Sequence, residues 1–148
     1  MADAAMREAI GDLPVPEFDV TAFTTPPPLR EATVAIVTSA GLMRPGEEPW
    51  PEGDSGFRIF DRDERDLIVG HQNTNFDRSG LAADLNVAYP VDRIDEMEAE
   101  GKIGAVASRH LSFTGPLMEL STLRIDTGPA AAKLLIDDGV DVVLLTPV

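Results

Sequence analysis

The sequence predicts an α/β protein: a Rossmann-like, mainly parallel sheet with flanking helices and an extended, Pro-rich N-terminal arm. The first observation is that strand-like apolar segments alternate with helical segments over residues 32–148. Such alternation produces parallel strands, because each helix returns the chain to the edge where the previous strand began. The second is the concentration of proline before residue 32, which marks residues 1–31 as the arm and residues 32–148 as one α/β domain.

The arm is predicted to be irregular. Pro14, Pro16 and the three consecutive prolines at 26–28 exclude a continuous helix and favour extended backbone, although residues 4–10 are compatible with a short helix. The arm also carries apolar residues that are unusual for a free tail: Leu13, Val15, Phe18, Val20 and Phe23. We therefore expect it to lie on the domain or on a partner.

Five segments of the domain are predicted to be extended, and residues 42–54, rich in Pro, Gly and Glu, are predicted to form a long loop. The first is a β-branched run that ends in small polar residues and Gly41, as a central strand that opens into a loop does. The second alternates like a short strand, and the last is a buried closing strand. The five segments are residues 32–41, 57–60, 66–71, 105–113 and 140–145.

Two helices carry clear boundary signals. Residues 90–101 begin with proline, place acidic side chains in the early turns, and end at Gly101. Their apolar residues are three apart, which gives one buried face. Residues 127–139 begin with Thr-Gly-Pro and end at Gly139, a residue suited to terminating a helix.

The composition excludes several classes of function. The formal net charge of −14 repels phosphate backbones and anionic lipid, so we expect neither a nucleic-acid partner nor a membrane. No apolar run approaches the roughly 20 residues that span a bilayer, and there is no signal-peptide pattern, so we expect a cytoplasmic location. The absence of cysteine excludes disulfides, thiolate metal sites and a cysteine nucleophile within these residues.

Thr38, Ser39 and Gly41 are candidate site residues because they lie where the first strand meets its loop, the usual position of a ligand cradle in α/β proteins. The segment is neither a G-x-G-x-x-G fingerprint nor a P-loop, so no nucleotide cofactor is implied. Small polar residues at a strand end also serve simply as turn formers.

A polar segment over residues 71–78 supplies further candidates. His71 is suited to acid–base chemistry, and Asp77 and Arg78 follow it; an arginine can clamp a carboxylate substrate through two hydrogen bonds. A turn held by Asn and Asp side chains is the simpler interpretation of the same residues. Asp92 and Arg93 lie in the first turn of the helix over 90–101, where Asp92 could pair with that segment or only complement the helix dipole. No histidine spacing indicates a metal site.

Several segments in order resemble one family, the selenoprotein B components of glycine/sarcosine/betaine reductase and D-proline reductase. The resemblance covers about residues 30–148 and is closer to the proline-reductase branch, although residues 71–76 are longer than the corresponding family loop. The segments that carry it are residues 34–42, 71–80, 84–86, 90–93, 100–104, 112–115 and 138–148.

The resemblance implies reductive C–N cleavage of a small amino-acid or betaine-like substrate by a complex with other reductase subunits. In that family the closing strand leads into a selenocysteine or cysteine, so we expect the redox residue directly after Val148 and none within this chain. A misread selenocysteine codon, a split gene and a degenerate paralogue all account for such an end. We therefore expect the chain alone to be inactive.

Two other functions remain open: a non-catalytic binding or assembly subunit of a split reductase, and a racemase- or lyase-like enzyme with His71 and Asp77 as acid and base. If the family function holds, the candidates Thr38, Ser39, His71, Asp77 and Arg78 should converge at the end of the strand over 140–145. We also expect incompletely covered apolar surface at Leu144, Leu145 and Val148, which favours an oligomer formed by self-association or with a partner.

Overall fold

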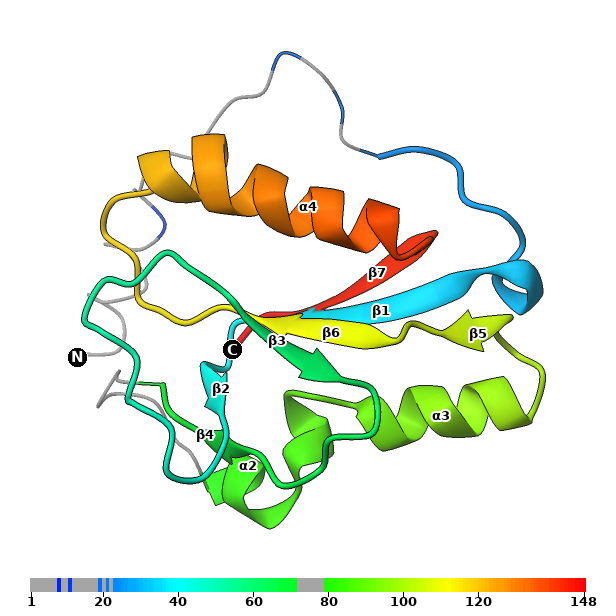
Figure 1. Cartoon of the computed structure of the whole chain (residues 1–148), viewed down its shortest axis with the longest axis horizontal. Helices are drawn as coiled ribbons and strands as arrows, with labels where there is room; N and C mark the ends of the chain where they lie inside the picture. Colours follow the sequence, from blue (N-terminus) through cyan, green and yellow to red (C-terminus); the bar gives the residue numbers. More distant parts are fainter. Residues whose placement is uncertain (1–7, 9–10, 12–18, 20, 22, 72–78) are drawn as a thin grey trace.

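The main sheet of the protein is mixed and is built around one central strand. The computed structural model describes residues 8, 11, 19, 21, 23–71 and 79–148. Strand β1 (Thr33–Thr38) pairs in parallel with β7 (Val142–Thr146) on one side and with β5 (Ala105–Val106) and β6 (Arg109–Ser112) on the other. Strand β3 (Arg58–Asp61) pairs antiparallel with β6. Among the described residues, β3 and β7 therefore form the two margins of the sheet (Figure 1).

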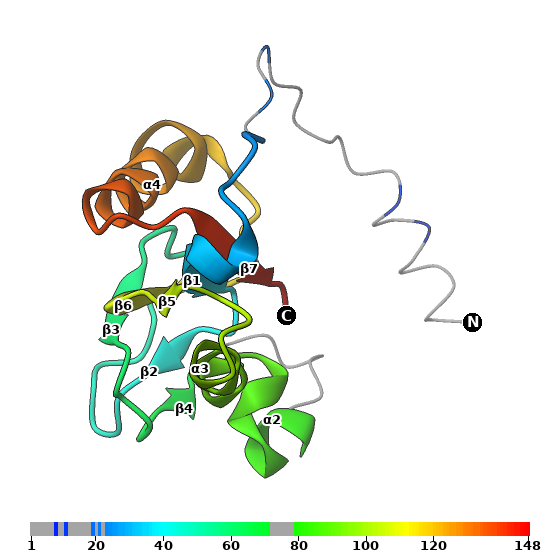
Figure 2. The ribbon, with the colours of Figure 1, turned by 90° about the vertical axis from the view of Figure 1, so that its right-hand side faces the viewer.

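Helices cover both faces of this sheet, which makes the α/β class expected from the sequence correct. Helix α4 (Gly128–Asp137), preceded by the π-turn η3 (Leu123–Thr127), lies on one face. Helix α3 (Val91–Ala99) and the short α2 (Ser79–Ala83) lie on the other (Figures 1 and 2). The described residues also form two 3-10 turns, η1 (Leu29–Glu31) and η2 (Leu85–Val87).

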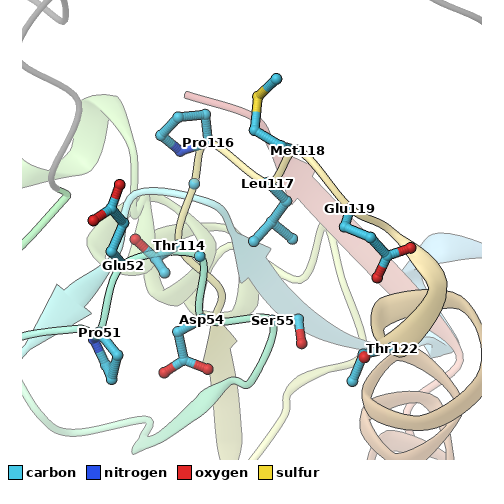
Figure 3. Close-up of a pocket in the computed structure, with 12 residues that line it drawn as sticks. Pro51, Glu52, Asp54, Ser55, Thr114, Pro116, Leu117, Met118, Glu119 and Thr122 are labelled. Carbon is cyan, nitrogen blue, oxygen red and sulfur yellow. The ribbon is translucent and has the colours of Figure 1, made fainter.

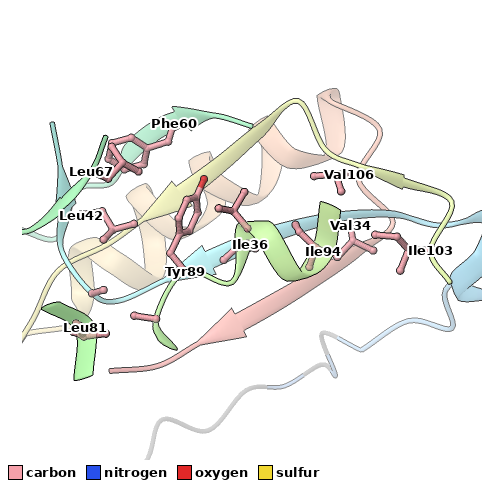
Figure 4. Close-up of a cluster of buried hydrophobic side chains, with 13 residues drawn as sticks. Val34, Ile36, Leu42, Phe60, Leu67, Leu81, Tyr89, Ile94, Ile103 and Val106 are labelled. Carbon is pink, nitrogen blue, oxygen red and sulfur yellow. The ribbon is translucent and has the colours of Figure 1, made fainter. Parts of the chain in front are cut away.

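The two faces of β1 contribute to separate cores, because successive side chains of a strand point to opposite faces. Val34 and Ile36 pack into the larger core, which also contains Ile94 of α3 and is drawn in Figure 4. Ala35 belongs to the smaller core beneath α4, where it meets Leu135. Burial on both faces explains why the four central residues of β1, Val34 to Val37, are all apolar rather than alternating.

The long segment after β1 is held by a second, two-stranded antiparallel sheet of β2 (Leu42–Met43) and β4 (Ile68–Val69). Trp50 is buried within this segment, and its indole N–H donates to the carbonyl oxygen of Leu42 at 3.2 Å. The guanidinium of Arg58 lies 4.3 Å from the centre of the Trp50 ring. The segment is therefore anchored to the sheet.

The His110 side chain replaces a backbone hydrogen-bond acceptor where the sheet is interrupted. Beside β1, strands β5 and β6 are separated by Ala107 and Ser108, so the regular ladder is broken at that point. The backbone N–H of Ile36 donates instead to Nδ1 of His110, at 3.1 Å. His110 is fully buried, and burial lowers its pKa to about 4. A neutral imidazole that accepts at Nδ1 carries its proton on Nε2.

Most elements predicted from the sequence are present, but the structure differs in several places. The predicted loop over 42–54 contains β2, and the extended segment predicted over 105–113 is divided into β5 and β6. The short helices α2, η1 and η2 were not predicted, and the helix predicted to start at residue 127 is continuous with η3. The prediction of an extended arm falls mostly outside the described residues, and residues 23–28 have no regular secondary structure. No helix among the described residues is both long and apolar enough to cross a lipid bilayer.

Candidate functional site

Three hydroxyl side chains stand in one row at the carboxyl ends of the parallel strands. Thr38 ends β1, and its partners in the register are Ser112 of β6 on one side and Thr146 of β7 on the other. In open α/β sheets ligands bind beyond this edge, because the loops that follow the strands gather there. The row therefore marks the edge at which to search for a site.

The hydroxyls of this row bind backbone rather than facing a cavity. Thr38 Oγ1 donates to the Thr146 carbonyl oxygen at 3.1 Å and accepts from the N–H of Ala40 at 3.2 Å. Ser112 Oγ accepts from the N–H of Leu42 at 2.9 Å. Thr146 Oγ1 donates to the carbonyl oxygen of Ala88 at 2.7 Å. These bonds fix where each loop leaves the sheet, so Thr38 is a positioning residue of the edge.

Ser39 and Gly41 hold the first loop against its neighbours. Ser39 Oγ accepts from the N–H of Val148 at 2.9 Å, which ties the segment after β7 to the loop after β1. Gly41 has φ +63°, a conformation that residues with a side chain rarely adopt. A Cβ atom at Gly41 would lie 2.8 Å from Thr114 Oγ1 and 3.1 Å from the backbone nitrogen of His71. Only glycine at position 41 leaves room for Thr114 and His71 to lie this close to its backbone.

His71 and Thr114 both lie close to the backbone of Gly41, and His71 also lies close to Gly115. The N–H of Gly70, the residue before His71, donates to the carbonyl oxygen of Gly41 at 2.8 Å, which fixes the backbone beside the first loop. A Cβ atom at Gly115 would lie 3.4 Å from Nε2 of His71. Thr114 Oγ1 is buried and has no hydrogen-bond partner among the described residues. A buried hydroxyl that makes no hydrogen bond lowers the stability of the fold, so the hydroxyl of Thr114 needs an explanation other than stability.

A surface pocket of about 610 Å³ opens next to the cluster and shares Thr114 and Gly115 with it (Figure 3). One wall is the loop over residues 51–55, and the other is the segment that follows β6. The described residues that line the pocket place acidic side chains at its rim and include no lysine, arginine or histidine: the carboxylates are those of Glu52, Asp54 and Glu119. Such a lining favours a cation over an anion.

The remaining predicted residues divide into two groups. Asp77 and Arg78 lie outside the described residues. Asp92 accepts from Arg65 Nε at 2.9 Å and from Asn86 Nδ2 at 2.9 Å, and the hydrogen bond from Asn86 is the main cause of its lowered pKa. Arg93 pairs with Glu96 at 3.0 Å on the surface of α3. Within the described residues, the side chains that bind Asp92 and Arg93 thus lie on α3 or beside it and do not belong to the cluster around Gly41.

The sequence analysis missed Thr114 and Gly115 as site candidates. A usable signal exists: residues 112–115 repeat the pattern of residues 38–41, a hydroxyl residue at a strand end followed three positions later by glycine. Parallel strands with the same ending bring these two loops together. Among the described residues, no group of three or more His, Asp or Glu side chains is arranged to hold a metal ion.

Comparison with known proteins identifies relatives over nearly the whole chain. The family model described as glycine/sarcosine/betaine reductase selenoprotein B matches residues 5–148. D-proline reductase subunit gamma of Acetoanaerobium sticklandii is 33% identical over 133 residues, which cover 82% of this chain and 54% of that protein. No solved structure matches.

Two further relatives are subunits of related complexes. The sarcosine reductase complex component B subunit beta of Peptoclostridium acidaminophilum is 31% identical over 142 residues, which cover 88% of this chain and 32% of that protein. The glycine reductase complex component B subunit gamma of Carboxydothermus hydrogenoformans is 32% identical over 150 aligned positions, 91% of this chain and 32% of that protein. The chain thus spans about half the length of the first relative and about a third of the others. It belongs to the glycine/sarcosine/betaine reductase selenoprotein B family.

Proposed function

We propose that this chain is the substrate-positioning part of a reductase complex that cleaves a C–N bond of a glycine-, sarcosine-, betaine- or proline-like compound with electrons from a dithiol. Two observations support the proposal: the family match over residues 5–148, and the convergence of Ser39, Gly41, His71 and Thr114 at the carboxyl edge of the sheet. We further propose that the sheet is part of a Rossmann-like arrangement, with residues 32–148 as one domain and residues 1–31 as its arm.

The chemistry of the pocket fits one end of such a substrate. All four compounds carry a positively charged nitrogen near neutral pH, and the carboxylates of Glu52, Asp54 and Glu119 would attract that end. Thr114 lines the pocket, and its hydroxyl, which has no hydrogen-bond partner among the described residues, would donate to a substrate bound there. Asp77 and Arg78 remain candidates for the opposite end, with Arg78 holding the substrate carboxylate.

The redox group would come from polypeptide outside these 148 residues, because the chain contains no cysteine and its five methionine thioethers cannot form a thiolate. The part of this chain would then be to bind the substrate, exclude water and orient the C–N bond. A second candidate function, assembly without substrate contact, is favoured by one observation: the hydroxyls of Thr38, Ser112 and Thr146 all bind backbone.

A titration followed by NMR separates the two functions. Glycine, sarcosine, betaine and D-proline are added separately to the ¹⁵N-labelled chain, with acetate as the anionic control. We expect at least one of the four, and not acetate, to shift the amide resonances of Gly41, His71, Thr114 and Gly115. A substrate-positioning role is excluded if all four leave these amides unchanged at millimolar concentration, or shift only amides far from the pocket.

A matched pair of variants sharpens the result. Thr114→Val removes the buried hydroxyl and keeps the shape of the side chain, so we expect binding to weaken about tenfold, the typical effect of one lost hydrogen bond. Thr33→Val makes the same change at the opposite end of β1 and should leave binding unchanged. Equal binding by both variants would remove Thr114 from the site.

A further inference from the structure

Strand β7 is an edge strand without the usual protection against pairing. Its five residues include no charge, no proline and no glycine, and Val143, Leu144 and Leu145 are 38%, 39% and 68% exposed. Among the described residues, β7 pairs with β1 alone. Natural edge strands are normally shielded by charges, prolines or bulges, because an open row of backbone groups accepts another strand. An uncharged, apolar and open edge therefore indicates a surface that is covered in the assembled protein.

The register shows which backbone groups are open. Thr38 and Thr146 are partners, and the Ser39 N–H donates to the Thr146 carbonyl oxygen at 3.3 Å. Strand residues alternate in the side to which they direct N–H and C=O, so Val142, Leu144 and Thr146 bind β1. Val143 and Leu145 direct theirs away from it. These two residues offer the alternating donors and acceptors that a neighbouring parallel strand uses.

The side chains of β7 are apolar on both faces. Val143 and Leu145 lie opposite Ala35 and Val37, on the face that α4 covers, and Leu144 lies opposite Ile36, on the face of α3. Figure 2 shows β7 at the margin of the sheet, away from β3. Strands of parallel sheets are normally buried on both faces, as β1 is here. The exposed faces of β7 match the environment of an interior strand.

We propose that β7 docks a further β-strand, parallel to itself and uncharged, from polypeptide that corresponds to the part of the family proteins not matched by this chain. The matched residues cover 54% of D-proline reductase subunit gamma and 32% of the sarcosine reductase component B subunit, so the relatives contain ample further polypeptide. A second copy of this chain is a poorer occupant, because each copy carries a net charge of −14. The proposal rests on the geometry of the edge and is independent of the substrate site.

The test uses the 148-residue chain, alone and co-expressed with the unmatched portion of Acetoanaerobium sticklandii D-proline reductase subunit gamma. Hydrogen–deuterium exchange reports on the amides of Val143 and Leu145, and light scattering reports on mass. We expect a monomer whose two amides exchange freely, and at least about tenfold slower exchange at both in the co-purified complex. Three results would overturn the proposal: no complex, a complex without protection at these amides, or a dimer of the chain in which both are already protected.

Two variants test whether the outward edge of β7 is the surface to which the further strand docks. Val143→Pro removes an outward N–H that β1 does not use, so the ladder with β1 stays intact while a docked strand loses a hydrogen bond. Leu145→Lys places a charge on the same edge, and Ile136→Lys, at a side chain 72% exposed on α4, is the matched control. We expect docking to weaken about tenfold or more for the first two and to be unchanged for the control. Unchanged docking of Leu145→Lys would contradict the proposal even if Val143→Pro failed to fold.

Discussion

Gly41 combines a left-handed backbone conformation with crowding around its Cβ position. Its φ of +63° is unfavourable for any residue with a side chain, and a Cβ atom there would approach Thr114 Oγ1 to 2.8 Å. Gly53 has a similar φ of +70°, but no atom of the described residues lies within 4 Å of the corresponding Cβ position. A comparison of alanine substitutions at Gly41 and Gly53 therefore separates the energetic cost of backbone strain from the cost of crowding around the added Cβ atom.

For Gly41→Ala we expect a loss of about 2–3 kcal/mol in the free energy of unfolding, from strain and crowding together. For Gly53→Ala we expect about 1 kcal/mol, from strain alone. Urea denaturation followed by circular dichroism measures both. Equal losses would show that Gly41 is required only for its backbone conformation and that the contact with Thr114 and His71 relaxes without cost.

His110 gives the protein a specific dependence on pH. Burial lowers its pKa from 6.5 to about 4; Asp95 raises the pKa, and Arg62 and Arg65 lower it, by less. Between these two pH values the unfolded chain binds a proton that the folded chain does not. The contribution of His110 is therefore fully present above pH 6.5 and decreases as the pH falls toward 4.

The expected loss from His110 over this range is about 3 kcal/mol, since one pKa unit corresponds to about 1.4 kcal/mol. His110→Gln keeps an acceptor for the Ile36 N–H and removes the titration. Urea midpoints measured between pH 7 and pH 4 should fall more steeply for the unmodified chain than for the variant. Parallel curves for the two proteins would mean that the imidazole is not buried in its neutral form.

At the scale of elements, an ion-pair network attaches α3 to the sheet. Arg62, in the turn after β3, contacts Asp95 Oδ1 and Glu98 Oε2 at 2.8 Å each. Glu98 in turn accepts from the N–H of Val106 in β5 at 2.8 Å. The hydrogen bond from Arg62 is the main cause of the lowered pKa of Glu98. The Arg62 guanidinium thus links the turn after β3 to α3 and, through Glu98, to β5.

Arg62→Met should lower the free energy of unfolding by about 1 kcal/mol, because the network is partly exposed and screened by solvent. Arg93→Met removes an isolated pair with Glu96 on the same helix, so we expect less than about 0.5 kcal/mol. The difference between the variants should shrink in 1 M salt, where exposed charges are screened. A difference that is absent at low salt would show that the network does not fasten α3.

The elements that the sequence predicts well are those with local signals. Helices α3 and α4 have proline near the start and glycine after the end, and Gly139 has the expected positive φ of +73°. Helix α2 was missed because it has only five residues, includes Gly80, and depends on the burial of Leu81 in the larger core. Its stability comes from tertiary packing, which the local sequence does not encode.

The candidate site could be predicted from the sequence only in part, for a similar reason. Ser39, Gly41 and His71 follow strands, and the rule that loops gather at the carboxyl edge was sufficient to select them. The repeated pattern of residues 38–41 and 112–115 could have selected Thr114, but its position beside Gly41 depends on the pairing of β6 with β1, which joins residues more than seventy positions apart. Asp92 and Arg93 were selected by position in a helix, whereas their partners are set by the turn after β3 and by η2.

For the whole molecule, we propose that this chain positions the substrate for a redox group held on other polypeptide. The most direct measurement is dithiol-dependent turnover of glycine, sarcosine, betaine and D-proline in a D-proline reductase complex whose subunit gamma carries the aligned 82% of this chain in place of its own matched segment. We expect turnover of at least one compound by the chimaera and none by the 148-residue chain alone, which contains no cysteine. Thr114→Val should reduce turnover about tenfold, and Thr33→Val should not. An assembled chimaera without turnover, or turnover that does not change in Thr114→Val, would contradict the claim.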